Sequence, residues 1–220
     1  MNTAVLDQLR LDGFAVAAGA IIEPLLSDLR AEAIRLVRRF TDDGYRSDDY
    51  WFFNAAGAGQ PVLYRIHNLE SQGSALISGL YADGPLHSLA ADILGAPVRS
   101  TACAMIVKMP GLAAAVPWHR DRTSVSPHSV CNLSVFLDDS VPENGCLEFV
   151  PGSHLLPDDA DVTRACERGP IQPVPAQAGD VLVHDVRMVH GSRRNTSATY
   201  RRSIVVEFAP VGLALTSEDG

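Results

Sequence analysis

The chain has 220 residues and a mass of 23.6 kDa, which is enough for one sizeable hydrophobic core and too little for two catalytic domains. A formal net charge of -8 argues against nucleic acid or an anionic membrane as a partner. No apolar stretch approaches ~18 residues, and the first twenty residues carry charges where a signal peptide needs apolar side chains. We therefore expect a single cytoplasmic domain over residues 1–220, as a monomer or a small homo-oligomer.

The four cysteines are scattered through the chain. Cys103, Cys131, Cys146 and Cys166 show no C-x-x-C spacing, so they match neither a zinc site nor a dense disulfide framework. We expect buried, reduced thiols.

Residues 1–97 form a mainly helical layer in our prediction. Apolar residues at helical spacing predict helices over 3–11, 24–40, 75–81 and 86–94, and a strand over 62–69. Residues 41–60 combine Asp and Gly with the aromatic run 51–53. Two interpretations of this segment stay open: a mobile lid over the substrate, or a long loop that its aromatic side chains anchor to the core.

From residue 98 to residue 210 the sequence changes to short β-like runs separated by Pro, Gly, Asn and Asp. The runs are VRSTACAMIVKM, SVCNLSVFLDD, GCLEFV, PIQPVPA, DVLVHD and RRSIVVEFAP. Short strands that follow a helical layer predict a mainly β fold with flanking helices, in which the strands form a double-stranded β-helix, or jelly roll, of the cupin kind.

The segment PWHRD carries a candidate metal site. His119 and Asp121 are one residue apart, so on an extended strand both side chains point to one face, while Trp118 and Arg120 point to the other. Two histidines and one carboxylate on one face of Fe(II) leave the other positions free for a co-substrate and oxygen. A third ligand is then needed from elsewhere.

Two later histidines compete for that third position. His184 ends the apolar run DVLVHD, and His190 follows six residues later beside Gly191. We favour His190, because a neighbouring glycine allows close backbone approach. His184 then becomes a residue of the pocket wall.

Arg201 begins an apolar strand eleven residues after His190. A guanidinium that enters a core needs a partner, and its forked geometry suits a carboxylate. The distal carboxylate of 2-oxoglutarate is the natural candidate, with a further hydrogen bond from Ser192. Arg202 alternates to the opposite face, where we expect it to be solvated.

These motifs, in this order, resemble the phytanoyl-CoA dioxygenase family of Fe(II)/2-oxoglutarate oxygenases. The resemblance rests on PWHRD, on NLSVFLDDSVPENGCLEFVPGSH and on the segment from PVPAQAGD to SIVVEF, and it is close over 98–210 and loose before. It implies that His119, Asp121 and His190 bind iron, and that Arg201 and Ser192 hold 2-oxoglutarate.

The same resemblance implies looser roles near the co-substrate for Lys108 and Asn132. It also implies that a small molecule, such as a specialised metabolite, is oxidised with O2 while 2-oxoglutarate becomes succinate and CO2. Because Asp121 is present, hydroxylation or another oxidative outcome is implied rather than halogenation. Desaturation, ring closure and epimerisation stay open beside hydroxylation.

On the substrate side we expect Arg65 and His67, which alternate on the predicted strand over 62–69, together with Trp51 and His184. The alternative is a metal-dependent cupin-type enzyme that does not use 2-oxoglutarate, such as an isomerase or a cofactor-free dioxygenase. Such an enzyme would have no need of Arg201.

Overall fold

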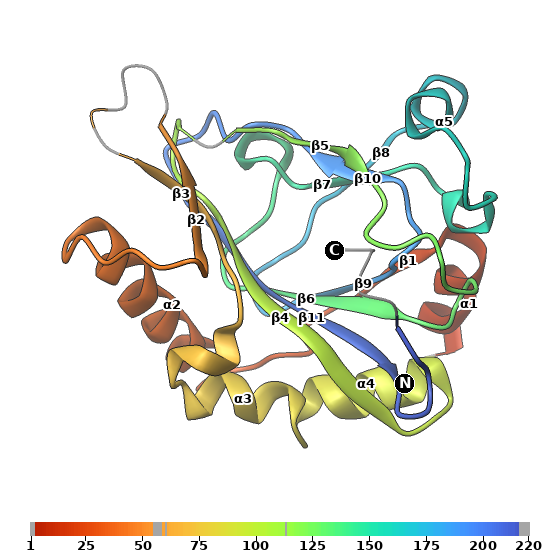
Figure 1. Ribbon diagram of the computed structural model, residues 1–220, viewed down its shortest axis with the longest axis horizontal. Helices are drawn as coiled ribbons and strands as arrows, with labels where there is room; N and C mark the ends of the chain where they lie inside the picture. Colours follow the sequence, from red (N-terminus) through yellow and green to blue (C-terminus); the bar gives the residue numbers. More distant parts are fainter. Residues whose placement is uncertain (1–2, 55–58, 60, 113, 216–220) are drawn as a thin grey trace.

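The structure is a computed structural model that describes residues 3–54, 59, 61–112 and 114–215. It contains two antiparallel sheets that face each other, with helices outside the larger sheet (Figure 1). The strands are β1 (Phe14–Ala17), β2 (Tyr50–Phe53), β3 (Val62–Ile66), β4 (Val98–Lys108), β5 (Val116–His119), β6 (Cys131–Phe136), β7 (Leu147–Phe149), β8 (Gln172–Val174), β9 (Val181–Asp185), β10 (His190–Ser192) and β11 (Arg201–Pro210). The helices are α1 (Thr3–Asp12), α2 (Leu25–Thr41), α3 (Ala75–Tyr81), α4 (Pro85–Leu94) and α5 (Val162–Arg168), with 3-10 turns at Leu69–Gln72, Pro142–Asn144 and Ser153–Leu155.

The larger sheet has the strand order β1-β9-β6-β11-β4-β3-β2, and the smaller has the order β5-β10-β7-β8. Neighbours in space are distant in sequence, as in β6, β9 and β11, which is the connectivity of a jelly roll. The predicted fold class is confirmed. The smaller sheet brings β5 beside β10, with His119 opposite His190.

Strand β11 shows how the fold separates core from cavity. Its residues alternate between the two faces of the sheet, because the side-chain period of a strand is two. Ile204, Val206 and Phe208 join the main hydrophobic cluster. Arg201 and Glu207 point the other way, into the space between the sheets.

Helices α2, α3 and α4 lie outside the larger sheet, along the lower side of Figure 1. Helix α2 places Leu29, Leu36 and Phe40 in the main cluster, and all three are almost fully buried. Their spacing of seven and four residues keeps them on one stripe of the helix. This helical layer covers the face of the larger sheet that is opposite the cavity.

Most predicted elements agree with the structure, and the expectations for one strand and for two residues need correction. The predicted strand over 62–69 ends at Ile66, and Leu69 begins a 3-10 turn. His190, for which we predicted no secondary structure, lies on the short strand β10. Arg202 is not solvated, since Asp138 accepts hydrogen bonds from its Nε at 2.8 Å and its Nη2 at 2.7 Å.

A search of the described helices finds none with the length and apolar character that crossing a bilayer requires.

Candidate active site

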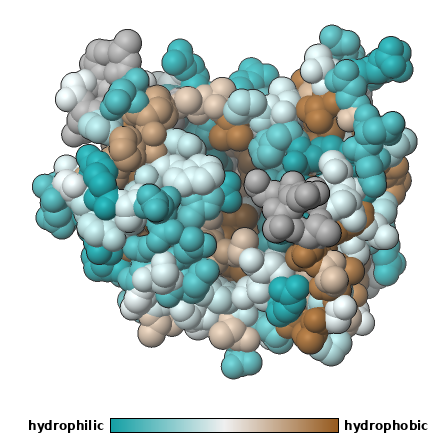
Figure 2. Space-filling view, viewed as in Figure 1, coloured by the Kyte–Doolittle hydropathy of each residue, from teal (hydrophilic) through white to brown (hydrophobic). Residues whose placement is uncertain are grey.

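A cavity of about 670 Å³ lies between the two sheets. The face shown in Figure 2 is hollowed near its centre, and hydrophobic atoms line the depth of the hollow. All but one of the residues that we predicted for the site line this cavity, and His67 is the exception. The lining set is Trp51, Arg65, Lys108, His119, Asp121, Asn132, His184, His190, Ser192 and Arg201.

His119, Asp121 and His190 form the candidate metal centre. One ligand atom from each lies within 4.8 Å of the others. His119 Nε2 is 3.4 Å from Asp121 Oδ1, and His190 Nε2 is 3.8 Å from Asp121 Oδ2. Two imidazole nitrogens and a carboxylate oxygen that converge in this way suit Fe(II).

The backbone fixes the orientation of both imidazole rings. Pro117 O accepts a hydrogen bond from His119 Nδ1 at 2.8 Å, and Met188 O accepts one from His190 Nδ1 at 3.0 Å. With Nδ1 protonated, each Nε2 keeps a free lone pair toward Asp121. This is the usual arrangement for histidines that bind a metal through Nε2.

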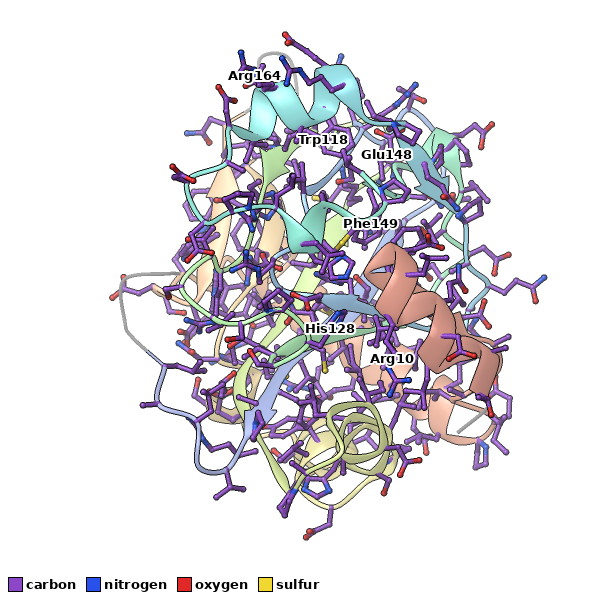
Figure 3. The ribbon with its side chains drawn as sticks, turned by 90° about the vertical axis from the view of Figure 1, so that its right-hand side faces the viewer. Arg10, Trp118, His128, Glu148, Phe149 and Arg164 are labelled. Carbon is purple, nitrogen blue, oxygen red and sulfur yellow. The ribbon has the colours of Figure 1, made fainter. Side chains whose placement is uncertain are left out.

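Gly191 allows β10 to approach β5 closely. A Cβ atom there would lie 3.0 Å from Val116 O and 3.3 Å from Trp118 Cδ2. Trp118 itself lies on the outer side, beneath helix α5 and Arg164 in Figure 3. The reason for favouring a histidine beside glycine therefore has a structural basis.

Asp121 lies beyond the end of its strand. We expected an extended strand through PWHRD, but β5 ends at His119 and the chain bends at Asp121. The carboxylate reaches the site because Val186 O accepts hydrogen bonds from the backbone N–H groups of Asp121 and Arg122, at 3.0 and 3.1 Å. A contact between two segments that lie outside the strands and far apart in sequence thus positions the carboxylate.

Two side chains of the larger sheet contact the Asp121 carboxylate. Asn132 Nδ2 donates to Oδ2 at 2.8 Å, and His184 Nε2 lies 3.3 Å from the same oxygen. His184 is thus a pocket-wall residue next to the candidate ligand set. The role of Asn132 toward the co-substrate stays a prediction, while its contact with Asp121 is direct.

The charges of the site suit metal binding. Burial favours the neutral acid, but the nearby imidazoles of His190, His119 and His184 hold the pKa of Asp121 well below its usual value. Burial lowers the pKa of His190 to about 3. At neutral pH the site therefore offers a carboxylate and a neutral imidazole, the forms that coordinate a cation.

Phe149 supports His190 from inside the protein. It is fully buried and is labelled near the centre of Figure 3. Its ring stacks on His190, with centroids 5.6 Å apart, and on Phe14 of the N-terminal strand at 4.7 Å. The aromatic stack holds the ligand ring in place and keeps water from its inner side.

Arg201 is a buried cation on the cavity wall. Only 2% of its surface is exposed, and within the described part of the chain its Nε has no hydrogen-bond acceptor. Burial lowers the pKa of Arg201 to about 10. Ser192 Oγ is likewise buried without a partner among those residues. Buried polar groups without partners are rare, and Arg201 and Ser192 together indicate a place for an anionic ligand.

Lys108 lies opposite Arg201 in the strand register. Its Nζ donates to Ala114 O at 3.1 Å and to Arg193 O. Burial, with the nearby Arg201 charge, lowers the pKa of Lys108 to about 7. The two cations lie at one end of the cavity.

The expected substrate residues divide into two groups. Trp51 and Arg65 line the cavity, and Arg65 Nε has no acceptor among the residues described. His67 follows the end of β3 and donates its backbone N–H to Asp49 O, so its ring packs 3.9 Å from Trp51 instead of reaching the cavity. The lid interpretation of 41–60 stays a prediction, since residues 55–58 and 60 lie outside the described residues.

Sequence reasoning missed a polar pair and a set of small side chains on the cavity wall. Arg122 donates to both oxygens of Glu207 at 3.0 Å. Ala102 and Ala104 of β4 line the cavity beside them. The period-two alternation of β11 places Glu207 on the same face as Arg201, so it was a usable signal, but nothing in the sequence marked Arg122.

Comparisons with known proteins identify the family of the chain and several relatives. The family model described as phytanoyl-CoA dioxygenase (PhyH) matches residues 9–203. The crystal structure of AviO1 from Streptomyces viridochromogenes Tue57 is 50% identical, with 98% of each chain covered and a TM-score of 0.94. The crystal structure of EvdMO1 is 52% identical, with a TM-score of 0.91. The match covers 95% of this chain and 50% of the EvdMO1 chain. Ectoine dioxygenase from Nocardia farcinica (strain IFM 10152) is 25% identical over 91% of this chain and 75% of its own.

Proposed function

Because the chain belongs to the phytanoyl-CoA dioxygenase family and is an Fe(II)/2-oxoglutarate-dependent dioxygenase, we propose that it hydroxylates a small molecule, such as a specialised metabolite. The reaction consumes 2-oxoglutarate and O2 and releases succinate and CO2. The proposal rests on one observation: Arg201, in the cavity that holds the His-Asp-His cluster, is buried, and its Nε has no acceptor among the described residues.

His119, Asp121 and His190 are the proposed Fe(II) ligands. The facing Nε2 atoms and the low pKa of Asp121 support this assignment. When bound, Fe(II) with 2-oxoglutarate activates O2 for attack on a C–H bond. The chain orients the ligands through backbone carbonyls and keeps water from one side of the centre through Phe149.

Arg201 is the proposed anchor of the distal 2-oxoglutarate carboxylate. A guanidinium can donate two parallel hydrogen bonds to a carboxylate, and Ser192 can donate a third. Lys108 adds positive charge from the facing strand. A cofactor-independent cupin-type enzyme would leave this buried charge without a purpose.

The substrate side of the site consists of Trp51, Arg65 and His184. The cavity volume falls in the range for small-molecule sites. Trp51 is 46% exposed and offers a flat surface at the cavity, while Arg65 is a hydrogen-bond donor nearer Asp121. Hydroxylation occurs where this surface holds a C–H bond toward the iron ligands.

The test is anaerobic addition of Fe(II) and 2-oxoglutarate to the purified protein, followed by its visible charge-transfer absorption. The wild type should show the band, and His190→Ala should abolish it. Arg201→Ala should need roughly 100-fold more 2-oxoglutarate, because a buried charge-assisted pair contributes several kcal/mol.

Arg202→Ala is the matched control. It removes the neighbouring guanidinium from the opposite face of the same strand, where the partner is Asp138. Its 2-oxoglutarate requirement should match that of the wild type. A wild-type protein that binds Fe(II) but shows no band with 2-oxoglutarate would overturn the proposal.

A further inference from the structure

Two arginines that do not touch the candidate metal centre hold the segments that carry its ligands. Arg120 stands between His119 and Asp121, and Arg187 stands three residues before His190. Both side chains extend away from the ligand cluster toward the segment 153–158, which follows β7. Neither is used in the chemistry proposed above.

All three guanidinium nitrogens of Arg187 donate hydrogen bonds, to four backbone carbonyls and one carboxylate. Its residue surface is only 4% exposed. Its acceptors are His154 O at 2.9 Å, Thr123 O and Val125 O at 2.7 Å each, Leu156 O at 2.5 Å, and Asp158 Oδ1. One side chain therefore connects the segment after Asp121 to the segment 153–158.

Arg120 is connected to the same set. Its Nε donates to Arg187 O at 2.8 Å, and its Nη1 donates to Pro157 O at 2.8 Å. Its Nη2 donates to Leu156 O at 3.3 Å, so the two arginines share an acceptor. The backbone of the first ligand pair is thus attached to the backbone of the segment that leads into His190.

The orientation of Asp121 depends on this connection. Asp121 lies past the end of β5, so no strand ladder fixes it, and its backbone N–H donates to Val186 O. Val186 is the residue before Arg187. A shift of the segment 186–188 would therefore move the Asp121 carboxylate relative to His190.

We propose that Arg120 and Arg187 are positioning residues that hold the Asp121 carboxylate in register with the two histidines. The inference rests on the proposed metal-binding function. A guanidinium presents five donors in a rigid fork, whereas a lysine ammonium is a single point of charge, so lysine cannot replace either residue. Loss of residues that orient metal ligands typically costs 10–100-fold in metal affinity.

The experiment compares Arg120→Ala, Arg120→Lys and Arg187→Lys with the wild type. Three quantities are measured: the dissociation constant for Fe(II) under anaerobic conditions, the charge-transfer band with 2-oxoglutarate, and the melting temperature of the metal-free protein. All three variants should bind Fe(II) about 10–100-fold more weakly and show a shifted or weakened band. Millimolar guanidinium ion should partly restore the band in Arg120→Ala.

Arg30→Lys is the matched control, because Arg30 also donates from its Nε to a backbone carbonyl, that of Leu137 at 2.7 Å, but lies on helix α2. It should leave the Fe(II) affinity and the band unchanged. For either arginine, variants with wild-type Fe(II) affinity and band, and at most a lowered melting temperature, would overturn the inference for that residue. Absence of the band in the wild type would instead overturn the proposed function.

Discussion

A buried charge without a partner, as at Arg201, is costly for a folded protein unless a ligand completes it. The guanidinium is 2% exposed, and its Nε has no acceptor among the described residues. Removing one partner of a buried charged pair typically costs about 3–5 kcal/mol. The presence of Arg201 is therefore better explained by binding of an anionic ligand than by a contribution to the stability of the fold.

His67 gives a prediction for the pH dependence of stability. Burial, with the nearby Arg65 charge, lowers its pKa to about 4, below an unfolded value of about 6.5. Between these values the unfolded chain binds a proton that the folded chain does not, so stability is lost as pH falls from 6.5 toward 4. Between pH 7 and pH 5 the free energy of unfolding should therefore fall less for His67→Gln than for the wild type. Urea titrations at several pH values measure this difference.

The comparison uses His87→Gln, which removes a partly exposed histidine from helix α4. Equal pH slopes for His67→Gln and the wild type would show that His67 does not contribute the acid sensitivity.

The cysteines give a second prediction at this scale. Cys103, Cys131 and Cys146 are each at most 4% exposed, and burial raises the pKa of all three thiols. Cys166 on α5 is partly exposed. A thiol reagent at pH 8 should modify one cysteine in the native protein and four in urea, counted by mass spectrometry. Cys166→Ser should remove the fast reaction, and rapid modification of a second thiol in the native wild type would contradict the burial argument.

At the scale of elements, α2 is the helix with the clearest inward face. Leu36 is fully buried against the sheet, whereas Ile34, two residues earlier, is 40% exposed. Leu36→Ala should cost about 2–5 kcal/mol of unfolding free energy, because it leaves a cavity. Ile34→Ala should cost much less, and urea denaturation followed by circular dichroism compares them. Equal costs would mean that α2 packs in another orientation.

Much of the element pattern could be predicted from the sequence, because its signals are local. The apolar period of α2 and the alternation of β11 correspond directly to helix and strand. The bend at Asp121 could not be predicted, since it depends on Val186 O, sixty-five residues later in the chain. Arg202 was assigned to solvent for the same reason: its partner Asp138 comes from another strand end.

In the candidate site, too, the features with local sequence signals could be predicted and those that depend on distant contacts could not. The spacing of His119, Asp121 and His190 and the resemblance in their motifs predicted a cluster that the structure brings together. The supporting contacts of Arg120 and Arg187 were not foreseen, because their acceptors are backbone carbonyls, which carry no sequence signature.

At the scale of the whole molecule, the site should be coupled to stability. Mn(II) with 2-oxoglutarate, each at about 100 times its dissociation constant, should stabilise the fold by about 2.7 kcal/mol per ligand. For a chain of this size each kcal/mol raises the melting temperature by about 2–4 °C. Differential scanning fluorimetry of chelator-treated and loaded protein measures the rise. Asp121→Ala should abolish the increase in melting temperature that depends on Mn(II). If this increase persists in the variant, the metal binds elsewhere.

The aromatic stack from Phe14 through Phe149 to His190 limits which segments of this fold can be exchanged between related proteins. Phe14 belongs to the first strand of the chain, yet only one aromatic ring separates it from a candidate iron ligand. We propose that residues 1–220 form one domain. On that basis the N-terminal segment and the jelly roll depend on each other and cannot be exchanged separately. Chimeras that exchange residues 1–97 between relatives should lose Fe(II) affinity unless the partners of Phe14 are exchanged with them.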